Sequence, residues 1–247
     1  MDVEVTEVGA GVHHARAKHV SWVLITEGEG VTVVDTGYPG DRDRLFRSLE
    51  LIGSRPSNVD ALVLTHGHPD HIGSAEHLRS TLGIPVWAHT AERANASGER
   101  IEQVSEVRLL REAWKPAVLV WALEILRLRA ASVERLQELQ TCGEQRLDVP
   151  GRPTMVHTPG HTSGHCSLHL PDRGALLVGD ALMTGHAVEP KRSGPRLLPD
   201  FFNSDTQQAR ASLSRLHDLA ADVVVPGHGP AFRGSPSDAV ELALAVV

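Results

Sequence analysis

The chain has 247 residues, of which 41% are hydrophobic, and 24 Lys and Arg against 31 Asp and Glu give it a formal charge of −7. This composition is typical of an ordinary folded protein and excludes a disordered or fibrous chain. An acidic balance without a long run of Lys or Arg offers no surface for a phosphate backbone, so we expect no nucleic-acid partner.

The cysteines and the apolar stretches bear on location. Cys142 and Cys166 are too few for a disulfide framework, and neither belongs to a CxxC pair. The N-terminus is acidic and shows no basic region followed by an apolar one, as a secretory signal would. The longest apolar stretch, 117–123, is far shorter than the roughly 20 residues that span a bilayer. We therefore expect a cytoplasmic protein that makes no contact with membranes.

The first 90 residues predict alternating strands and helices. Val31-Thr32-Val33-Val34 is typical of the β-like runs, and a turn signal at 28–30 precedes it. Apolar residues at helical spacing follow and stop at Gly53. The expected strands cover 3–8, parts of 19–36, 61–64 and 85–88, and the expected helices cover 42–52 and 71–82.

From about residue 91 to residue 140 the pattern becomes helical and rich in Glu, Arg, Leu and Ala. The stretch 117–126 is apolar nearly all round, which implies burial on more than one side. Two interpretations fit this stretch. It is a core or dimer-packing helix, or it is a cap whose inner face forms an apolar substrate pocket.

Strand patterns return after Gly143. The expected strands cover 154–158, 166–170, 175–178 and 223–225, and the expected helices cover 205–220 and 237–246. Because both halves of the chain supply strands and helices, we expect a layered α/β architecture.

The most informative feature is the number of histidines, 15, and their placement. Thr65-His66-Gly67-His68-Pro69-Asp70-His71 follows the expected strand 61–64 directly. Side chains two residues apart share a face of an extended chain, so His66 and His68 can turn toward one metal ion. Asp70 and His71 lie where the chain enters a helix and can aim at a second point nearby. Ligand sites in α/β folds lie at such carboxyl ends of strands.

Three further motifs repeat this device. His161 lies in a turn after the strand 154–158, Asp180 ends the strand 175–178, and His228 follows the last strand. Each is a hydrophobic strand that delivers a ligand beside a glycine. One such motif is weak evidence, but together they indicate a metal site.

With this ordered set, from Asp35-Thr36-Gly37 through His228, the chain resembles the metallo-β-lactamase-fold hydrolase superfamily, and in particular its glyoxalase II-like branch. The resemblance covers nearly the whole chain. It implies a four-layer αββα sandwich that forms a single domain over 1–247, with a helical insertion around 91–140.

The resemblance also implies two divalent metal ions. The first would be held by His66, His68 and His161, and the second by Asp70, His71 and His228. Asp180 would bridge the two ions, and Asp35 would orient a ligand histidine. Imidazole and carboxylate ligands suit zinc, which we expect, although they also suit iron and manganese.

The resulting hypothesis is a dinuclear hydrolase. A hydroxide that bridges the metals would attack an ester, thioester or lactone carbonyl, and Asp70 would orient that hydroxide as a catalytic residue. The expected partner is a small-molecule acyl substrate. His186, six residues after Asp180, is a candidate substrate contact.

The chain also departs from its nearest family patterns. Glyoxalase II carries a glycine, cysteine and arginine segment after the bridging aspartate, whereas residues 181–186 contain neither cysteine nor arginine. Glutathione thioesters are therefore disfavoured. The lactonase branch places a tyrosine after the bridging aspartate, but Tyr38 is the only tyrosine here.

Two alternative functions use the same fold. One is a mononuclear iron oxidoreductase similar to persulfide dioxygenases, and the other is a phosphodiesterase or nuclease. The insertion has an alternative role as well: it would pair two copies of the chain in a homodimer.

Overall fold

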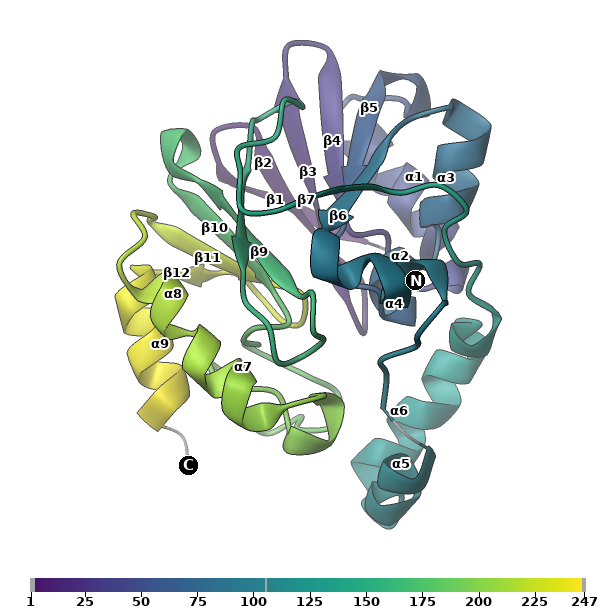
Figure 1. Cartoon of the computed structure of the whole chain (residues 1–247), viewed down its shortest axis with the longest axis vertical. Helices are drawn as coiled ribbons and strands as arrows, with labels where there is room; N and C mark the ends of the chain where they lie inside the picture. The colour runs from purple at the N-terminus through teal and green to yellow at the C-terminus, as the bar shows by residue number, and fades with distance from the viewer. Residues whose placement is uncertain (1–2, 105, 246–247) are drawn as a thin grey trace.

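The computed structural model describes residues 3–104 and 106–245, and it contains two β-sheets (Figure 1). The first sheet has seven strands in sequence order: β1 (Glu4–Gly9), β2 (Val12–Arg16), β3 (Ser21–Glu27), β4 (Gly30–Val34), β5 (Val59–Val63), β6 (Val86–His89) and β7 (Gln140–Cys142). The second has five strands in the order β12-β11-β10-β9-β8: β8 (Thr154–His157), β9 (Cys166–Leu170), β10 (Ala175–Gly179), β11 (Val223–Pro226) and β12 (Phe232–Arg233).

Strand direction determines which loops meet. β1 to β4 pair antiparallel, whereas β4, β5, β6 and β7 run parallel. In the second sheet β10 and β11 are parallel. Parallel neighbours end at the same edge of a sheet, so the loops after β4 and β5, and those after β10 and β11, lie side by side.

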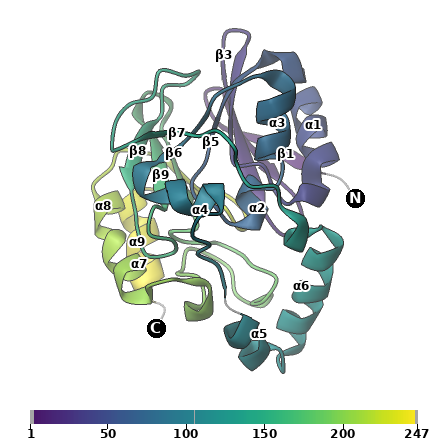
Figure 2. The same cartoon turned by 45° about the vertical axis from the view of Figure 1, so that its right-hand side comes forward.

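The helices lie on the outer faces of the sheets and in the insertion. They are α1 (Arg42–Leu51), α2 (Pro69–Ile72), α3 (Ala75–Leu82), α4 (Arg93–Ser97), α5 (Glu106–Glu112), α6 (Pro116–Arg127), α7 (Thr206–Ser212), α8 (Ser214–His217) and α9 (Pro236–Ala245). Figure 2 shows α5 and α6 at one end of the molecule, away from α1 and α3.

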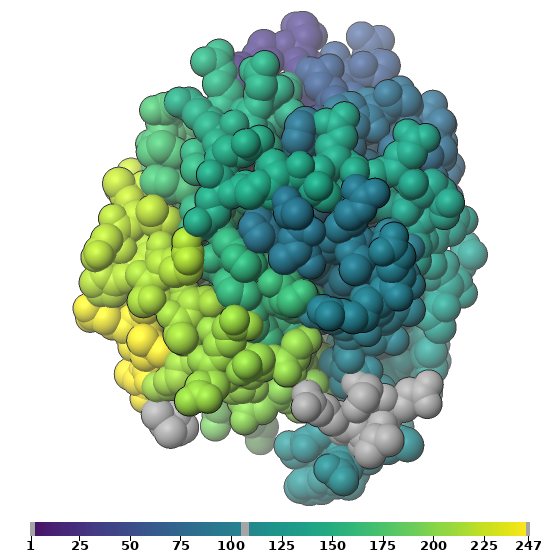
Figure 3. All heavy atoms as spheres, in the orientation of Figure 1, coloured from purple at the N-terminus to yellow at the C-terminus, as the bar shows by residue number. Residues whose placement is uncertain are grey.

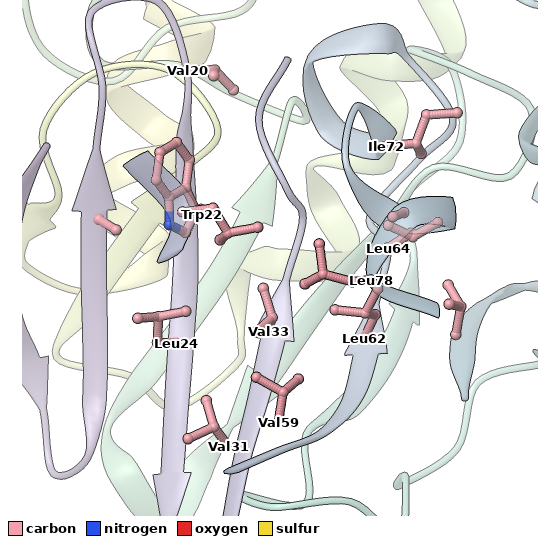
Figure 4. Close-up of a cluster of buried hydrophobic side chains, with 14 of the residues drawn as sticks. Val20, Trp22, Leu24, Val31, Val33, Val59, Leu62, Leu64, Ile72 and Leu78 are labelled. Atoms are coloured by element: carbon pink, nitrogen blue, oxygen red, sulfur yellow. The ribbon is translucent and has the colours of Figure 1, made fainter. Parts of the chain in front are cut away.

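Three hydrophobic cores separate four layers. α1 and α3 cover one face of the first sheet, where Leu78 packs near Val33 and Leu62 (Figure 4). The facing sides of the two sheets form the second core. α7, α8 and α9 close the outer side of the second sheet, with Leu216 and Val240 in the third core. The predicted four-layer αββα sandwich is therefore confirmed.

The predicted elements differ from the observed ones in detail. β2, β7 and β12 are not among the expected strands, and the expected helix 205–220 is two helices. The expected helix 71–82 is broken between α2 and α3, because Gly73 packs against the backbone of Gly37 and Tyr38, where a Cβ would lie 2.4 Å from the Gly37 carbonyl oxygen.

The insertion is less helical than its composition predicts. α4, α5 and α6 account for its α-helices, and residues 128–139 contain a single 3-10 turn, Ala130–Ser132. Gly98 ends α4 with φ +82°. The predicted domain 1–247 includes residues 1–2, 105 and 246–247, and the predicted helix 237–246 includes residue 246. These residues lie outside the described part of the chain. No helix in the described part of the chain has the length and apolarity to cross a membrane.

The first core predicts a large stability effect. Leu62 is fully buried, so Leu62→Ala removes packing from both the sheet and the helices and should lower the free energy of unfolding by roughly 2–5 kcal/mol. Leu51→Ala, on the exposed side of α1, should change it by less than about 0.5 kcal/mol. Urea unfolding of both variants measures the difference, and equal losses would contradict this assignment of the core.

Candidate metal centre

The predicted ligand residues come from both sheets and converge at one edge of the sandwich. In the first sheet the loop after β5 carries His66 and His68, and the start of α2 carries Asp70 and His71. In the second sheet the carriers are the β8–β9 loop, the end of β10 and the end of β11, which supply, in that order, His161, Asp180 and His228.

Three of these histidines form one ligand group. The candidate ligand atoms of His66, His68 and His161 lie within 4.8 Å of one another, and all three side chains are buried. The His161 Nε2 atom is 2.9 Å from His68 Nδ1. We call this set the first group.

Asp70, His71 and His228 form the second group, again with ligand atoms within 4.8 Å. The Asp70 Oδ2 atom lies 3.5 Å from His228 Nε2 and 3.8 Å from His71 Nε2. Both histidines are buried, whereas Asp70 is partly exposed.

Asp180 stands between the two groups. Its Oδ2 lies 3.4 Å from His161 Nε2 in the first group and 3.2 Å from His228 Nε2 in the second. Its Oδ1 lies 3.4 Å from His71 Nε2. This is the place that the predicted bridging ligand requires.

Each of the five histidines uses its other ring nitrogen for a contact with the protein. The pairs are His66 Nδ1 with Thr65 Oγ1 (3.0 Å), His68 Nε2 with the Glu102 carbonyl (2.7 Å), His71 Nδ1 with Asp35 Oδ2 (2.8 Å), His161 Nδ1 with Asn203 Oδ1 (3.1 Å) and His228 Nδ1 with the His19 carbonyl (2.7 Å). Metal-binding histidines in proteins are oriented in this way.

The inward atoms fit a metal. His66 Nε2, His71 Nε2 and Asp180 Oδ1 are buried and make no hydrogen bond to any described residue. Such atoms are destabilising unless something satisfies them. A divalent cation does so, because neutral imidazole and carboxylate are its usual ligands.

The two groups differ in charge. Burial lowers the pKa of His68 to about 3 and that of His66 well below its usual value, so these rings are neutral. Burial alone would also lower the pKa of His71, but the carboxylates of Asp180, Asp35 and Asp70 outweigh it and raise that pKa to about 10.

Asp35 supports the second group from the loop after β4. Besides contacting His71, it accepts hydrogen bonds from the Thr65 amide (2.9 Å) and the Thr65 hydroxyl (2.8 Å). Its φ of +61° is uncommon for a residue with a side chain, although aspartate tolerates it better than most. The strained backbone is thus held by the same contacts that orient His71.

A cavity of about 250 Å³ opens over both groups. The insertion supplies much of its apolar wall through Val104, Leu109, Trp121, Ile125 and Leu126, and Leu198 and Phe202 complete it. No Lys or Arg occurs among the described residues that line it. A more open hollow of about 630 Å³, beside α5, contains none of the seven ligand candidates.

Residues of the insertion thus line the cavity, which agrees with the interpretation of the insertion as a cap; the cap stays a prediction. Trp121 turns toward the cavity, whereas Leu119 and Leu123 on the same helix are about half exposed. Figure 3 shows one face of the molecule in space-filling form, with teal atoms of the insertion at its lower end. The homodimer through the insertion stays a prediction.

His186 lies in the cavity wall, with its ring centroid 4.7 Å from that of His228. Its Nδ1 accepts a hydrogen bond from the Val188 amide (3.2 Å). Burial lowers its pKa well below the usual value, so the ring is neutral. This position agrees with a substrate contact, which stays a prediction.

Sequence reasoning missed other residues of the site. Tyr38 lines the cavity beside Asp70. His165 Nε2 accepts a hydrogen bond from the Asp180 amide (2.9 Å), which fixes the backbone at Asp180. The position of Tyr38, directly after Asp35-Thr36-Gly37, was a usable signal, because this loop neighbours the one after β5.

Comparison with known proteins agrees with this geometry. The family model described as the metallo-beta-lactamase superfamily matches residues 15–228. The chain belongs to the metallo-β-lactamase superfamily. A probable metallo-hydrolase, YflN of Bacillus subtilis, is 29% identical, with 95% of this chain and 93% of the relative covered.

Solved structures are also similar to this chain. The metallo-beta-lactamase family protein TTHA1429 from Thermus thermophilus gives a TM-score of 0.63 at 27% identity, covering 90% of this chain and 72% of that one. TTHA1623, solved in a di-iron-bound form, gives 0.58 at 25% identity, covering 87% and 89%. The chain is thus a metallo-hydrolase-type superfamily member with a His/Asp cluster suited to divalent metal.

The charge difference predicts unequal pH dependence of metal binding. Metal at the second group must displace the His71 proton, which is bound below pH 10, so affinity there should rise as pH rises from about 6.5 to about 8.5. The first group contains His66 and His68 without protons to displace, so its affinity should change less. Calorimetric titration with Zn²⁺ at several pH values measures both. Equal pH slopes for the two groups would contradict the assignment.

Proposed function

We propose that the protein is a hydrolase that uses two divalent metal ions, most suitably zinc, to cleave esters, thioesters or lactones of small apolar acyl groups, as the glyoxalase II-like branch does with its own substrates. The observation that carries this proposal is the apolar cavity that opens directly over both ligand groups. It brings an uncharged acyl group and the metal ligands together at one place.

Two ions are supported by the layout of the ligands. The first and second groups are each complete, and Asp180 contacts both. TTHA1623, a similar protein, was solved in a di-iron-bound form, so iron is the second choice of metal. When bound, two such ions supply a water that ionises near neutral pH and a Lewis acid for a carbonyl oxygen.

The cavity favours a carbonyl over a phosphate substrate. A phosphodiester carries a negative charge, and its binding is normally supported by Lys or Arg. The described lining residues offer neither, while Asp70 and Asp180 add negative charge at the floor. The same argument disfavours glutathione thioesters, since glutathione is anionic.

The residues that line the cavity near the ligand groups have different functions in this proposal. Asp70 is the partly exposed carboxylate of the second group, so it can accept a proton from the attacking water and orient it. Tyr38 lines the same cavity beside Asp70. Trp121 and Phe202, whose ring centroids are 5.4 Å apart, exclude water from the acyl group, and His186 lies against both.

The direct test uses the purified protein and a panel of uncharged hexanoyl esters, hexanoyl thioesters and lactones. Chelation should abolish hydrolysis, and about two equivalents of Zn²⁺ should restore it. Asp70→Asn should lower kcat by roughly 100-fold or more, because it removes both a ligand and a proton acceptor.

The control substrate is bis(p-nitrophenyl) phosphate, which should not be cleaved. Oxygen consumption with a persulfide and one iron per chain, without hydrolysis of any carbonyl substrate, would move the protein to the dioxygenase alternative. Rapid cleavage of the phosphodiester would favour the nuclease alternative instead.

Tyr38 gives a second test. Burial, and then the neighbouring Asp70, raise the pKa of Tyr38 well above its ordinary value, so the phenol keeps its proton beside the Asp70 carboxylate. Tyr38→Phe keeps the ring and removes the hydroxyl beside this charged group. We expect kcat to fall roughly tenfold, which corresponds to about 1.4 kcal/mol.

Steady-state kinetics of Tyr38→Phe measure this fall, while the unfolding midpoint and the metal content should stay unchanged. An unaltered kcat would show that Asp70 needs no support from the phenol.

A further inference from the structure

Glu92 is a fully buried carboxylate close to the metal centre but outside both ligand groups. It ends the 3-10 turn Thr90–Glu92 between β6 and α4. Its Oε1 accepts a hydrogen bond from the Gly67 amide (2.7 Å). Its Oε2 accepts hydrogen bonds from the Thr162 hydroxyl (2.7 Å) and the Gly164 amide (3.0 Å). Asn95 donates a further hydrogen bond to Oε1 (2.5 Å).

These partners belong to two different ligand loops. Gly67 separates His66 from His68 in the loop after β5, and Thr162 follows His161 in the β8–β9 loop. One carboxylate thus joins a loop of the first sheet to a loop of the second, at the place where the first group is assembled. The relative position of the first-group ligands depends on that connection.

The backbone of both ligand loops packs closely against Glu92 and Asn95. A Cβ on Gly164 would lie 2.1 Å from the Glu92 nitrogen, and a Cβ on Gly67 would lie 2.9 Å from Asn95 Nδ2. Only glycine at these positions lets both ligand loops approach Glu92 and Asn95 without a shift of neighbouring atoms.

The second group has different supports. His71 is held by Asp35, and His228 is held by the His19 carbonyl. The hydrogen bonds that the structure gives Glu92 reach neither of these pairs. Glu92 therefore supports only the loops of the first group, whereas Asp35 contacts His71 directly and reaches His66 through the Thr65 hydroxyl.

We propose that Glu92 is a positioning residue for the metal ion of the first group, and that loss of its carboxylate weakens this ion while the ion of the second group stays bound. The inference rests on the proposed two-metal site but not on the proposed hydrolysis of carbonyl compounds. It gives the insertion a second role, because its first turn holds ligand loops while α6 lines the cavity.

The experiment titrates metal-free protein with Co²⁺ and follows its visible absorption, with metal content measured after dialysis. Wild type, Glu92→Gln and the control Glu99→Gln are compared. Glu99 lies seven residues further on and is exposed. Glu92→Gln should weaken one of two binding events about 10- to 100-fold, the range usual for groups that orient metal ligands. Glu99→Gln should match wild type.

A second background assigns the weakened ion. His228→Ala removes a ligand of the second group, so the remaining strong site is the first group. Adding Glu92→Gln to this background should weaken that remaining site by the same factor and change its cobalt spectrum. If the His228→Ala protein binds metal equally well with and without Glu92→Gln, the proposal is overturned. It is also overturned if Glu92→Gln alone, in the protein that keeps His228, weakens both sites equally.

Thr162→Val keeps the test decisive if Glu92→Gln does not fold. It removes one hydrogen bond to Glu92 at nearly constant volume and should weaken the first site in the same direction, by a smaller factor. An unchanged first site in a folded Thr162→Val protein would then overturn the proposal. Because every readout is metal affinity, a protein that binds metal normally but cleaves no carbonyl substrate refutes the proposed function alone.

Discussion

The structure depends on one constraint: imidazole and carboxylate groups from two separate sheets must be held together in a site where most of them are buried. His66 Nε2 and Asp180 Oδ1 are buried without a hydrogen bond from any described residue, which is unfavourable for the protein alone. The surrounding fold offsets this cost through the hydrophobic cores between its layers. A divalent cation turns the same atoms from a source of instability into ligands.

The sandwich meets the constraint by ending strands from both sheets at one edge. Backbone proximity there is extreme. Gly227 precedes His228, and a Cβ at Gly227 would lie 2.4 Å from Asp180 Oδ1 and 2.8 Å from the His71 ring. Glycine at position 227 therefore leaves room for the Asp180 carboxylate, which lies close to both groups. Other glycines beside ligands allow other close contacts: a Cβ on Gly67 would meet Asn95, and a Cβ on Gly160 would meet Ala209.

Most of the ligand candidates could be predicted from sequence because they follow a buried apolar strand, namely β5, β10 or β11. That pattern fixes the position of a side chain such as Asp180, whereas β8, which precedes His161, is only partly buried. Glu92 could not be predicted, because its role comes from contacts with loops about 25 and 70 residues away. β2 was missed because His13 and His14 interrupt its apolar pattern, although His14 is buried in the sheet. The break in the helix at Gly73 was missed because it is caused by packing against the loop that contains Gly37 and Tyr38, which is distant in sequence.

The measurement that tests the account most directly is an anomalous diffraction map of crystals grown with zinc. We predict two peaks about 3.5–4 Å apart, one among the first-group histidines and one at the second group, with the Asp180 carboxylate between them. A single peak at full zinc loading, or peaks that do not contact these residues, would contradict the central claim that the seven side chains hold two metal ions.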